Sequence, residues 1–508
     1  MEVQLLVMRK NGIINGGNMA IIVHTNKSEL EYDIWTLVRA FYPQNEVLVN
    51  NDKIAEYSGE IDFTIYVNIT EAEERVVYSK VYIKGISIIE EEKCDYKNYK
   101  EAKNLIKRQI YKIINRYSGK ELPWGILTGI RPTKLAVARL EAGAAPKEVE
   151  EYLKKEYLVS DEKIDLGIEI AKRELKLLEG IDYENGYSLY IGIPFCPSTC
   201  LYCSFTSYPI SMYKEKSDMY VAALLKEIEF AREAFKDKKL NTVYFGGGTP
   251  TALEAYQLEK LLKAVRESFD FTYCKEFTVE AGRPDSITKE KLLVLKKYGV
   301  TRISINPQTM KQETLDIIGR RHTVADVIEK FNMAREVGFD NINMDFIVGL
   351  PNEGYEDVKN SMEDVKKLNP DSITIHSLAI KRASRLNMFK DNYKEMTIEN
   401  NMEIMKMTHD YAVSMGMGPY YMYRQKNMAG NMENVGYARV DKAGIYNILI
   451  MEEKQTILAL GAGAVTKYVF NTGGRIERVD NVKNVDQYID RIDEMIKKKR
   501  DFLWKMLS

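Results

Sequence analysis

Three of the five cysteines in this 508-residue chain fall within eight residues, in the segment YIGIPFCPSTCLYCSF. Cys196, Cys200 and Cys203 have the spacing C-x3-C-x2-C, directly after a short apolar run. A loop this short can present three sulfurs to one metal cluster. Iron–sulfur cubes normally take four cysteines, so three would leave one iron open to a substrate or cofactor, as in a catalytic zinc site. The spacing therefore indicates an iron–sulfur cluster with one free coordination position.

Two other interpretations of these cysteines stay open. A structural zinc site would take its fourth ligand from Cys274 or from one of the four histidines. Inert thiols are the second alternative. A disulfide framework is disfavoured, because five cysteines are an odd and sparse set for a chain of this length.

A glycine loop is the second candidate for chemistry. Gly246, Gly247, Gly248 and Thr249 follow another short apolar run. Glycines let backbone N–H and C=O groups approach a polar ligand closely. A tight strand-to-helix turn would use the same residues, so the glycines alone do not distinguish a ligand site from a turn.

The elements that must position these residues alternate regularly from residue 187 onward. Short apolar runs that predict strands alternate with amphipathic segments that predict helices. Six such strands imply an α/β fold with a parallel sheet and right-handed crossovers. The count suits a partial (β/α)6 TIM-like barrel, although an open doubly wound sheet would give a similar string. The expected strands are 188–195, 241–245, 276–281, 302–306, 341–348 and 372–378, and the expected helices are one capped by Ser217 and those over 256–269, 288–299, 312–318, 324–337 and 355–368.

Unusual residues stand at or just after the end of each expected strand. Active sites of parallel barrels lie at the C-terminal ends of the strands. Groups far apart in the sequence would therefore converge on one rim, and this convergence is stronger evidence than any single motif. The residues concerned are Cys196, Gly246 to Thr249, Glu280, Gln308, Asp345, Ala379, Lys381 and Arg382.

The rest of the chain suggests two flanking regions. Residues 1–182 read as an α+β extension, with strands over 61–68 and 76–87 and helices over 101–117 and 160–178. The Gly- and Pro-rich stretch PWGILTGIRPTK within it is interpreted as a structured connector, with a functional Arg131 or Lys134 as the alternative. Residues 183–385 would form the barrel, and residues 386–508 a mostly helical C-terminal domain.

Composition limits the function classes. Lys plus Arg is 73 and Asp plus Glu is 74, so the net charge of −1 excludes a bulk polybasic nucleic-acid binder. The longest apolar run, 457–465, is far shorter than the roughly 20 residues that span a bilayer. No signal peptide is evident at the N-terminus. We therefore expect a monomeric cytosolic protein without nucleic-acid partners.

The cysteine loop followed by GGGTPT resembles the radical S-adenosylmethionine enzymes. The segments YIGIPFC, YFGGGTPT, VEAGRPD, SINPQTM, GRRHT, NMDFIVGLP and IHSLAIKRAS, in that order, are similar to the oxygen-independent coproporphyrinogen III oxidases. The resemblance is close from residue 187 to residue 385 and looser beyond. The long N-terminal extension and Gly192, where the main family usually carries His, resemble the HemZ branch of coproporphyrinogen dehydrogenases.

The resemblance implies roles for particular residues. Cys196, Cys200 and Cys203 would hold a [4Fe–4S] cluster, and S-adenosylmethionine would chelate its fourth iron. Tyr190 would also take a catalytic role. The positions that match S-adenosylmethionine contacts of the family are Tyr190, Tyr202, Gly247, Gly248, Thr249, Glu280, Gln308, Arg320, Asp345 and Ala379.

The implied reaction is the oxygen-independent decarboxylation of two propionates of coproporphyrinogen III to vinyl groups, which gives protoporphyrinogen IX. The implied agent is a 5′-deoxyadenosyl radical, with electrons from a donor such as flavodoxin or ferredoxin. The substrate carries four carboxylates and needs local positive charge. Position and charge suggest Lys381, Arg382, Arg385 and Arg424, unless they are only a solvated basic run.

Two other functions remain possible on the same motifs. One is a haem-binding or trafficking protein, and the other is a radical enzyme that acts on haem itself. The related haem-trafficking proteins typically carry an HN-x-x-YW motif after the barrel. The comparable stretch here reads YRQKNMAGNMENVGYA, without Trp, which disfavours a haem chaperone.

Overall fold

The computed structural model describes residues 19–507, apart from 44, 51–53, 56, 72–75, 84–87, 96–98, 206, 382–383, 389–395, 426–427 and 471–473. The chain divides into two compact units. One comprises Met1–Gly129 with Pro146–Asp165, and the other Ile130–Ala145 with Leu166–Ser508. The three-part division expected from the sequence stays a prediction.

The first unit is built on a five-stranded sheet in the order β2-β1-β3-β4-β5. Strand β1 pairs parallel with β2 and β3, whereas β3, β4 and β5 are antiparallel. Apolar side chains of α2 and α3 are buried in this α+β unit. Its elements are β1 (Ala20–Thr25), α2 (Glu31–Phe41), β2 (Glu46–Val49), β3 (Ile61–Glu71), β4 (Val76–Ile83), β5 (Ile89–Asp95), α3 (Tyr99–Ser118) and α5 (Pro146–Tyr157).

Six parallel strands form the centre of the second unit, in the order β6-β9-β10-β11-β12-β13. This confirms the expected α/β array, and the order of these six strands in the sheet follows their order in the chain. Among the described residues no strand pairing joins the two edges of the sheet. The strands are β6 (Gly186–Ile193), β9 (Lys239–Gly247), β10 (Glu276–Glu280), β11 (Arg302–Ser304), β12 (Ile342–Val348) and β13 (Ser372–Ser377).

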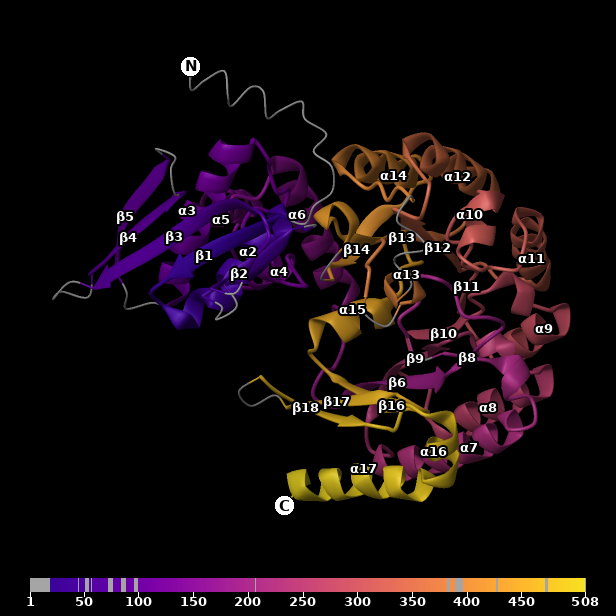
Figure 1. Ribbon diagram of the computed structural model, residues 1–508. Coiled ribbons are helices and arrows are strands. Elements are labelled where there is room, and N and C mark those ends of the chain that lie inside the picture. Colours follow the sequence, from indigo (N-terminus) through magenta and orange to yellow (C-terminus); the bar gives the residue numbers. More distant parts are fainter. Residues whose placement is uncertain are drawn as a thin grey trace. The chain divides into compact units, whose positions relative to one another are not determined.

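Helices between these strands form the outer layer of the unit (Figure 1). The helix expected over 288–299 is present as α9, and Thr288 caps it, because its side chain accepts from the Lys291 N–H. The expected cap at Ser217 is wrong. Lys216 occupies the cap position of α7, and the Ser217 hydroxyl instead donates to the Lys214 carbonyl at 2.8 Å. The helices are α7 (Ser217–Ala234), α8 (Ala255–Ser268), α9 (Lys289–Lys297), α10 (Gln312–Ile317), α11 (Val324–Val337) and α12 (Tyr355–Leu368).

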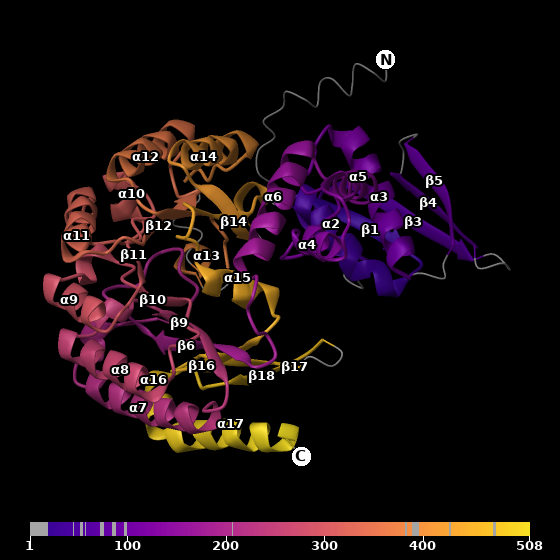
Figure 2. The same cartoon turned by 180° about the vertical axis from the view of Figure 1, so that it is seen from behind.

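The C-terminal region contains helices, as expected, but also strands that the sequence patterns did not reveal. Strand β15 pairs antiparallel with β13, and β16 pairs parallel with β6, so the region extends both edges of the parallel array. Helices α16 and α17 pack against α7 (Figures 1 and 2). The elements are α14 (Met402–Ser414), β14 (Gly418–Tyr423), β15 (Asn434–Ala438), α15 (Ile445–Glu452), β16 (Thr456–Leu460), β17 (Val465–Phe470), β18 (Arg475–Asp480), α16 (Val485–Asp490) and α17 (Ile492–Leu507).

The Gly- and Pro-rich stretch 123–134 is a turn-rich segment, as expected, and it leads into α4 (Lys134–Glu141). Helix α6 (Asp161–Leu177) matches the helix expected over 160–178. None of the helices in the described ranges is long and apolar enough to cross a membrane. The cytosolic location stays a prediction.

Candidate active site

One cavity of about 700 Å³ opens at the C-terminal ends of the parallel strands, within the second unit. Such a volume is typical of ligand sites. Its lining includes residues from the cysteine loop, the glycine loop and all six strand ends. The predicted site residues that line it are Tyr190, Cys196, Cys200, Tyr202, Cys203, Gly247, Gly248, Thr249, Glu280, Gln308, Arg320, Asp345, Ala379 and Lys381.

The structure brings only some of the basic residues proposed to bind the substrate to the cavity. Lys381 lines the cavity, and its ammonium lies 5.5 Å from the ring centroid of Phe205. Arg385 is exposed and Arg424 is buried, and neither is among the lining residues. The Arg424 guanidinium instead donates to the side chain of Asn431 at 2.6 Å. Arg382 lies outside the described residues.

The cysteine loop is tied at both ends. Strand β7 (Phe195–Cys196) pairs with β8 (Tyr208–Pro209), and the Leu201 N–H donates to the Ile318 carbonyl at 2.9 Å. Cys196 and Cys200 are buried and Cys203 is half-buried. Burial raises the pKa of Cys196 to about 11, although the Thr249 hydroxyl, 3.5 Å from its sulfur, lowers it. The free thiol is therefore protonated at neutral pH, and a bound metal would have to displace its proton.

Cys274, one of the candidates for the fourth ligand of a zinc site, does not lie with the other three cysteines. Cys274 lies just before β10 and is not among the residues that line the cavity, and its thiol donates to the Glu276 carbonyl. In the described part of the chain, no group of three or more His, Cys, Asp or Glu side chains is placed to hold a single metal ion.

The glycine loop packs directly against the cysteine loop. The Thr249 N–H donates to the Phe195 carbonyl at 2.7 Å, and the Gly248 N–H donates to the Ile193 carbonyl at 2.8 Å. A Cβ atom at Gly248 would lie 2.5 Å from the Phe195 oxygen and 3.0 Å from the Cys196 sulfur. Gly247 has φ +111°, which strongly favours glycine. The glycines therefore serve both close packing and access to the cavity.

Side chains from alternate positions of β10 to β13 give the cavity a polar wall, because every second residue of a strand points to the same face. Several of their polar atoms are buried and have no hydrogen-bond partner within the described structure. Unsatisfied buried groups are costly, so these atoms mark where a polar ligand would bind. On β11 and just after it they are Arg302 Nε, Ser304 Oγ and Asn306 Oδ1, and a fourth such atom is Arg320 Nε, from the segment that follows α10.

Two carboxyl groups on this wall have different protonation. Burial raises the pKa of Glu280 to about 7, the Tyr244 hydroxyl that donates to it at 2.5 Å lowers it, and Asp345 raises it. Burial also opposes ionisation of Asp345, but His376 and Asn343 outweigh it and lower the pKa of that carboxyl. Asp345 therefore stays ionised at neutral pH, whereas Glu280 can bind a proton.

Aromatic rings line another part of the cavity. The ring of Tyr244 stacks on Tyr446 with centroids 4.4 Å apart, and Tyr190 stacks with both at 6.2 Å. Burial raises the pKa of Tyr190, so its phenol stays protonated. The sequence patterns did not single out Tyr244 or Tyr446. Tyr244 carried a signal, since it precedes the glycine loop by two positions, but Tyr446 comes from a distant helix and carried none.

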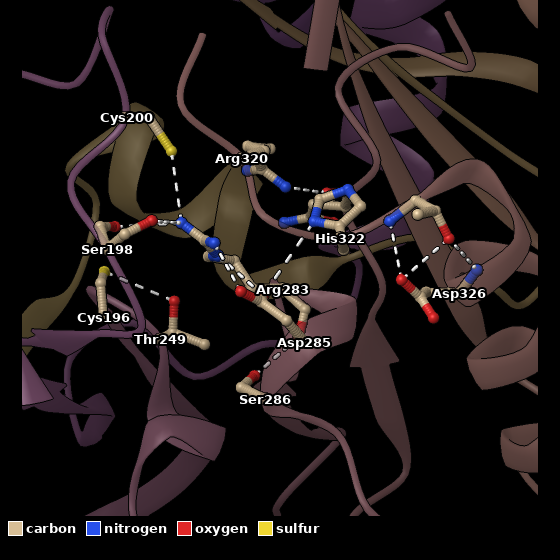
Figure 3. A network of polar contacts seen from close by, with 12 residues as sticks. Cys196, Ser198, Cys200, Thr249, Arg283, Asp285, Ser286, Arg320, His322 and Asp326 are labelled. Carbon is tan, nitrogen blue, oxygen red and sulfur yellow. Dashed lines mark hydrogen bonds and ion pairs between the residues drawn. The ribbon is translucent and has the colours of Figure 1, made fainter. Parts of the chain in front are cut away.

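Arg283 is a further residue that sequence reasoning missed, although it lies in the quoted segment VEAGRPD. Figure 3 shows its guanidinium between the cysteine loop and Asp285. It donates to Ser198 and Asp285 and lies 3.7 Å from the Cys200 sulfur. Arg320, beside it, donates to the Asn306 carbonyl at 2.5 Å and the Tyr202 hydroxyl at 3.1 Å.

Comparisons with known proteins agree with this geometry. Residues 190–365 match the family model of the radical SAM superfamily. The oxygen-independent coproporphyrinogen-III oxidase-like protein HemZ of Bacillus subtilis is 39% identical over 93% of this chain and 95% of that protein. The heme chaperone HemW of Bacillus subtilis is 32% identical over 60% of this chain and 76% of that protein. The solved structure of coproporphyrinogen III oxidase (HemN) from Escherichia coli has a TM-score of 0.50 and 24% identity, over 62% of this chain and 71% of that one, and supports the fold.

Members of the radical SAM superfamily use a [4Fe–4S] cluster and S-adenosylmethionine, and both cofactors are those expected from the sequence. The residues present fit them. Three cysteines line a cavity that also offers unpaired polar atoms to a zwitterionic, ribose-bearing ligand. With one relative 39% identical over nearly its whole length, this chain belongs to the radical SAM superfamily and, within it, to the family of the HemZ coproporphyrinogen-III oxidase-like protein.

Proposed function

We propose that this chain is a radical SAM oxidoreductase that oxidatively decarboxylates propionate side chains of coproporphyrinogen III to vinyl groups, giving protoporphyrinogen IX. The observation that carries the proposal is the shared cavity. The cysteine loop, the glycine loop and the polar strand ends all line the same space of about 700 Å³. The identity of the HemZ relative supports the choice of a tetrapyrrole substrate.

The cysteines Cys196, Cys200 and Cys203 would hold the cluster. When bound, the cluster and S-adenosylmethionine supply a carbon radical that can take a hydrogen atom from a propionate side chain. The protein orients the reactants and excludes water. The residues that would hold S-adenosylmethionine are Tyr190, Tyr202, Gly247, Gly248, Thr249, Glu280, Gln308, Arg320, Asp345 and Ala379.

Particular contacts suit these roles. Arg320 retains a buried Nε–H without a partner in the described structure, which suits pairing with a carboxylate. The ionised Asp345 can accept from a ribose hydroxyl. Tyr190 keeps its proton and would act as a hydrogen-bond donor beside the reacting atoms.

Lys381 is the one basic substrate candidate that the described residues bring to the cavity. Burial lowers the pKa of its ammonium, and Cys203 raises it. The amine lies 5.5 Å from the ring centroid of Phe205, two residues after Cys203, and so stands beside the cysteine loop. A substrate carboxylate bound there would lie close to the cluster. Arg385 is exposed, Arg424 is buried and donates to Asn431, and neither is among the residues that line the cavity.

A haem chaperone is the second candidate, favoured by relatives named heme chaperone HemW, one 32% identical over 60% of this chain. A reducing anoxic incubation with S-adenosylmethionine and either coproporphyrinogen III or haem separates the functions. Vinyl product with 5′-deoxyadenosine supports our proposal. Tight haem binding without turnover supports the chaperone, and 5′-deoxyadenosine formed only with haem supports an enzyme that acts on haem.

Two cysteine variants provide a matched control for that incubation. Cys200→Ala removes a cysteine of the cavity, and Cys274→Ala removes a half-buried cysteine outside it. We expect loss of 5′-deoxyadenosine and vinyl product only for Cys200→Ala. Equal activity of the two variants would contradict the proposal.

A further inference from the structure

The cysteine loop is held by a buried charged clamp. The Arg283 side chain is 3% exposed, and its guanidinium donates to both oxygens of Asp285, at 2.9 and 2.6 Å. It also donates to the carbonyl and hydroxyl oxygens of Ser198, at 3.0 and 2.8 Å. Ser198 lies between the first two cysteines, so the clamp joins the middle of the loop to the segment that follows β10.

The same guanidinium touches a sulfur of the site. Its Nη1 lies 3.7 Å from Cys200 Sγ. Figure 3 shows Cys200 and Asp285 on opposite sides of Arg283, so the positive group stands between the sulfur and the carboxylate. With both carboxylate oxygens and Ser198 as acceptors, the guanidinium is fixed in position, as bidentate pairs usually are.

A fixed positive charge beside a cluster ligand has a definite electrostatic effect. Reduction adds one negative charge to the cluster, and a nearby cation stabilises that charge. Hydrogen bonds to cluster sulfurs and nearby charges set reduction potentials in iron–sulfur proteins. Asp285 has the opposite charge and partly offsets the effect of Arg283.

We propose that Arg283 is a positioning residue that holds the cysteine loop and raises the reduction potential of the cluster, and that Asp285 limits this rise. The inference rests on the proposed assignment of the three cysteines as cluster ligands. The proposal also explains the order of residues in GRPD, because Arg283 and Asp285 form an ion pair across the single Pro284 between them.

The test compares Arg283→Gln, Arg283→Lys and Asp285→Asn with the natural chain after anoxic reconstitution. Iron and sulfide content measures loading, and a redox titration followed by EPR measures the midpoint potential. Arg321→Gln is the matched control, because Arg321 is an exposed arginine in the same GRRHT segment as Arg320.

We expect the potential to fall in Arg283→Gln, such that the ratio of reduced to oxidised cluster at a fixed applied potential drops about tenfold, or about 59 mV. Asp285→Asn should raise the potential, and Arg283→Lys should keep more of the natural value while loading less iron. Loosening of the loop alone would move Arg283→Gln and Asp285→Asn in the same direction. Changes of opposite sign in the reduction potential of the two variants therefore distinguish an electrostatic effect of Arg283 and Asp285 from a loss of loop structure.

An unchanged potential in Arg283→Gln, or equal signs in the two variants, would overturn the inference. If Arg283→Gln loads no cluster, Asp285→Asn decides, and a lowered or unchanged potential there is a refutation. Failure of the natural chain to load any cluster would instead refute the assignment of the cysteines, so the two failures are distinguishable.

Discussion

Removal of the buried amine of Lys499 should destabilise the second unit by several kcal/mol. Lys499 on α17 and Glu227 on α7 are both fully buried, and the ammonium donates to the Glu227 carboxylate and, at 2.7 Å, to the Ala459 carbonyl. In Lys499→Met the Glu227 carboxylate would keep its hydrogen bonds but lose its counter-charge. Breaking a buried pair in this way costs about 3–5 kcal/mol, a large share of the roughly 5–15 kcal/mol that folded chains have.

The destabilisation caused by Lys499→Met should extend to the cavity. Glu227 also accepts from the Gly461 N–H at 2.8 Å, from Asn481 at 2.8 Å and from the Tyr488 hydroxyl at 2.6 Å. The loop after Gly461 lines the cavity with Gly463 and Ala464. Loss of Lys499 therefore loosens the far edge of the site as well as α17.

Urea denaturation followed by circular dichroism measures the effect. Lys498→Met is the control, because Lys498 is half-exposed and its pair with Asp480 at 3.6 Å is a surface pair worth at most about 1 kcal/mol. The double variant Glu227→Gln with Lys499→Met, which leaves neither charge, should cost less than Lys499→Met alone. A cost below about 1 kcal/mol for Lys499→Met, or a double variant that costs more than Lys499→Met alone, would refute the reasoning.

Three further predictions concern the cavity and its surroundings. In the folded chain the pKa of Glu280 is about 7, above that of an unfolded Glu near 4.3, so its contribution to stability is full below about pH 4 and is lost as the pH rises through 7. Glu280→Gln should therefore flatten the pH dependence of the urea midpoint between pH 5 and 8, and an unaltered pH profile would contradict this. Burial lowers the pKa of His322 to about 4, so the contribution of this side chain to stability is present above about pH 6.5 and is lost as the pH falls to 4. Between pH 6.5 and pH 4, His322→Gln should therefore lose less stability than the natural chain, and an equal loss would speak against burial as the cause. Gly248→Ala forces a Cβ against the Phe195 carbonyl and should lower iron loading and cost about 1–3 kcal/mol, and normal loading with an unchanged urea midpoint would show that the loops can separate freely.

Local patterns predicted the central array and much of the lining. The central strands carry apolar residues at alternate positions, because one face of the sheet packs under the helices while the other faces the cavity. The cysteine and glycine loops follow strands at short distances in the sequence. Parallel strands end at one rim, so Glu280, Gln308 and Asp345 could be placed together without a structure. Each of them does line the cavity.

Contacts between distant segments could not be read in this way. Tyr446 reaches the cavity from α15, and Arg283 reaches Cys200 over 83 positions of sequence. The charge of Arg424 says nothing of its burial, which depends on β14 and the turn that carries Asn431. The strands β14 to β18 are short, and short apolar segments cannot be assigned to strand or helix from periodicity alone. Their place in the sheet is set by distant pairing, since β15 pairs with β13 and β16 with β6.

The most direct test of the proposed function follows a hydrogen atom. Coproporphyrinogen III carrying deuterium on the propionate carbon next to each pyrrole ring is incubated anoxically with the reconstituted, reduced protein and S-adenosylmethionine. Mass spectrometry then measures deuterium in 5′-deoxyadenosine and vinyl groups in the porphyrin product. The account predicts labelled 5′-deoxyadenosine and vinyl product together, and 5′-deoxyadenosine without deuterium beside an unaltered porphyrin would contradict it.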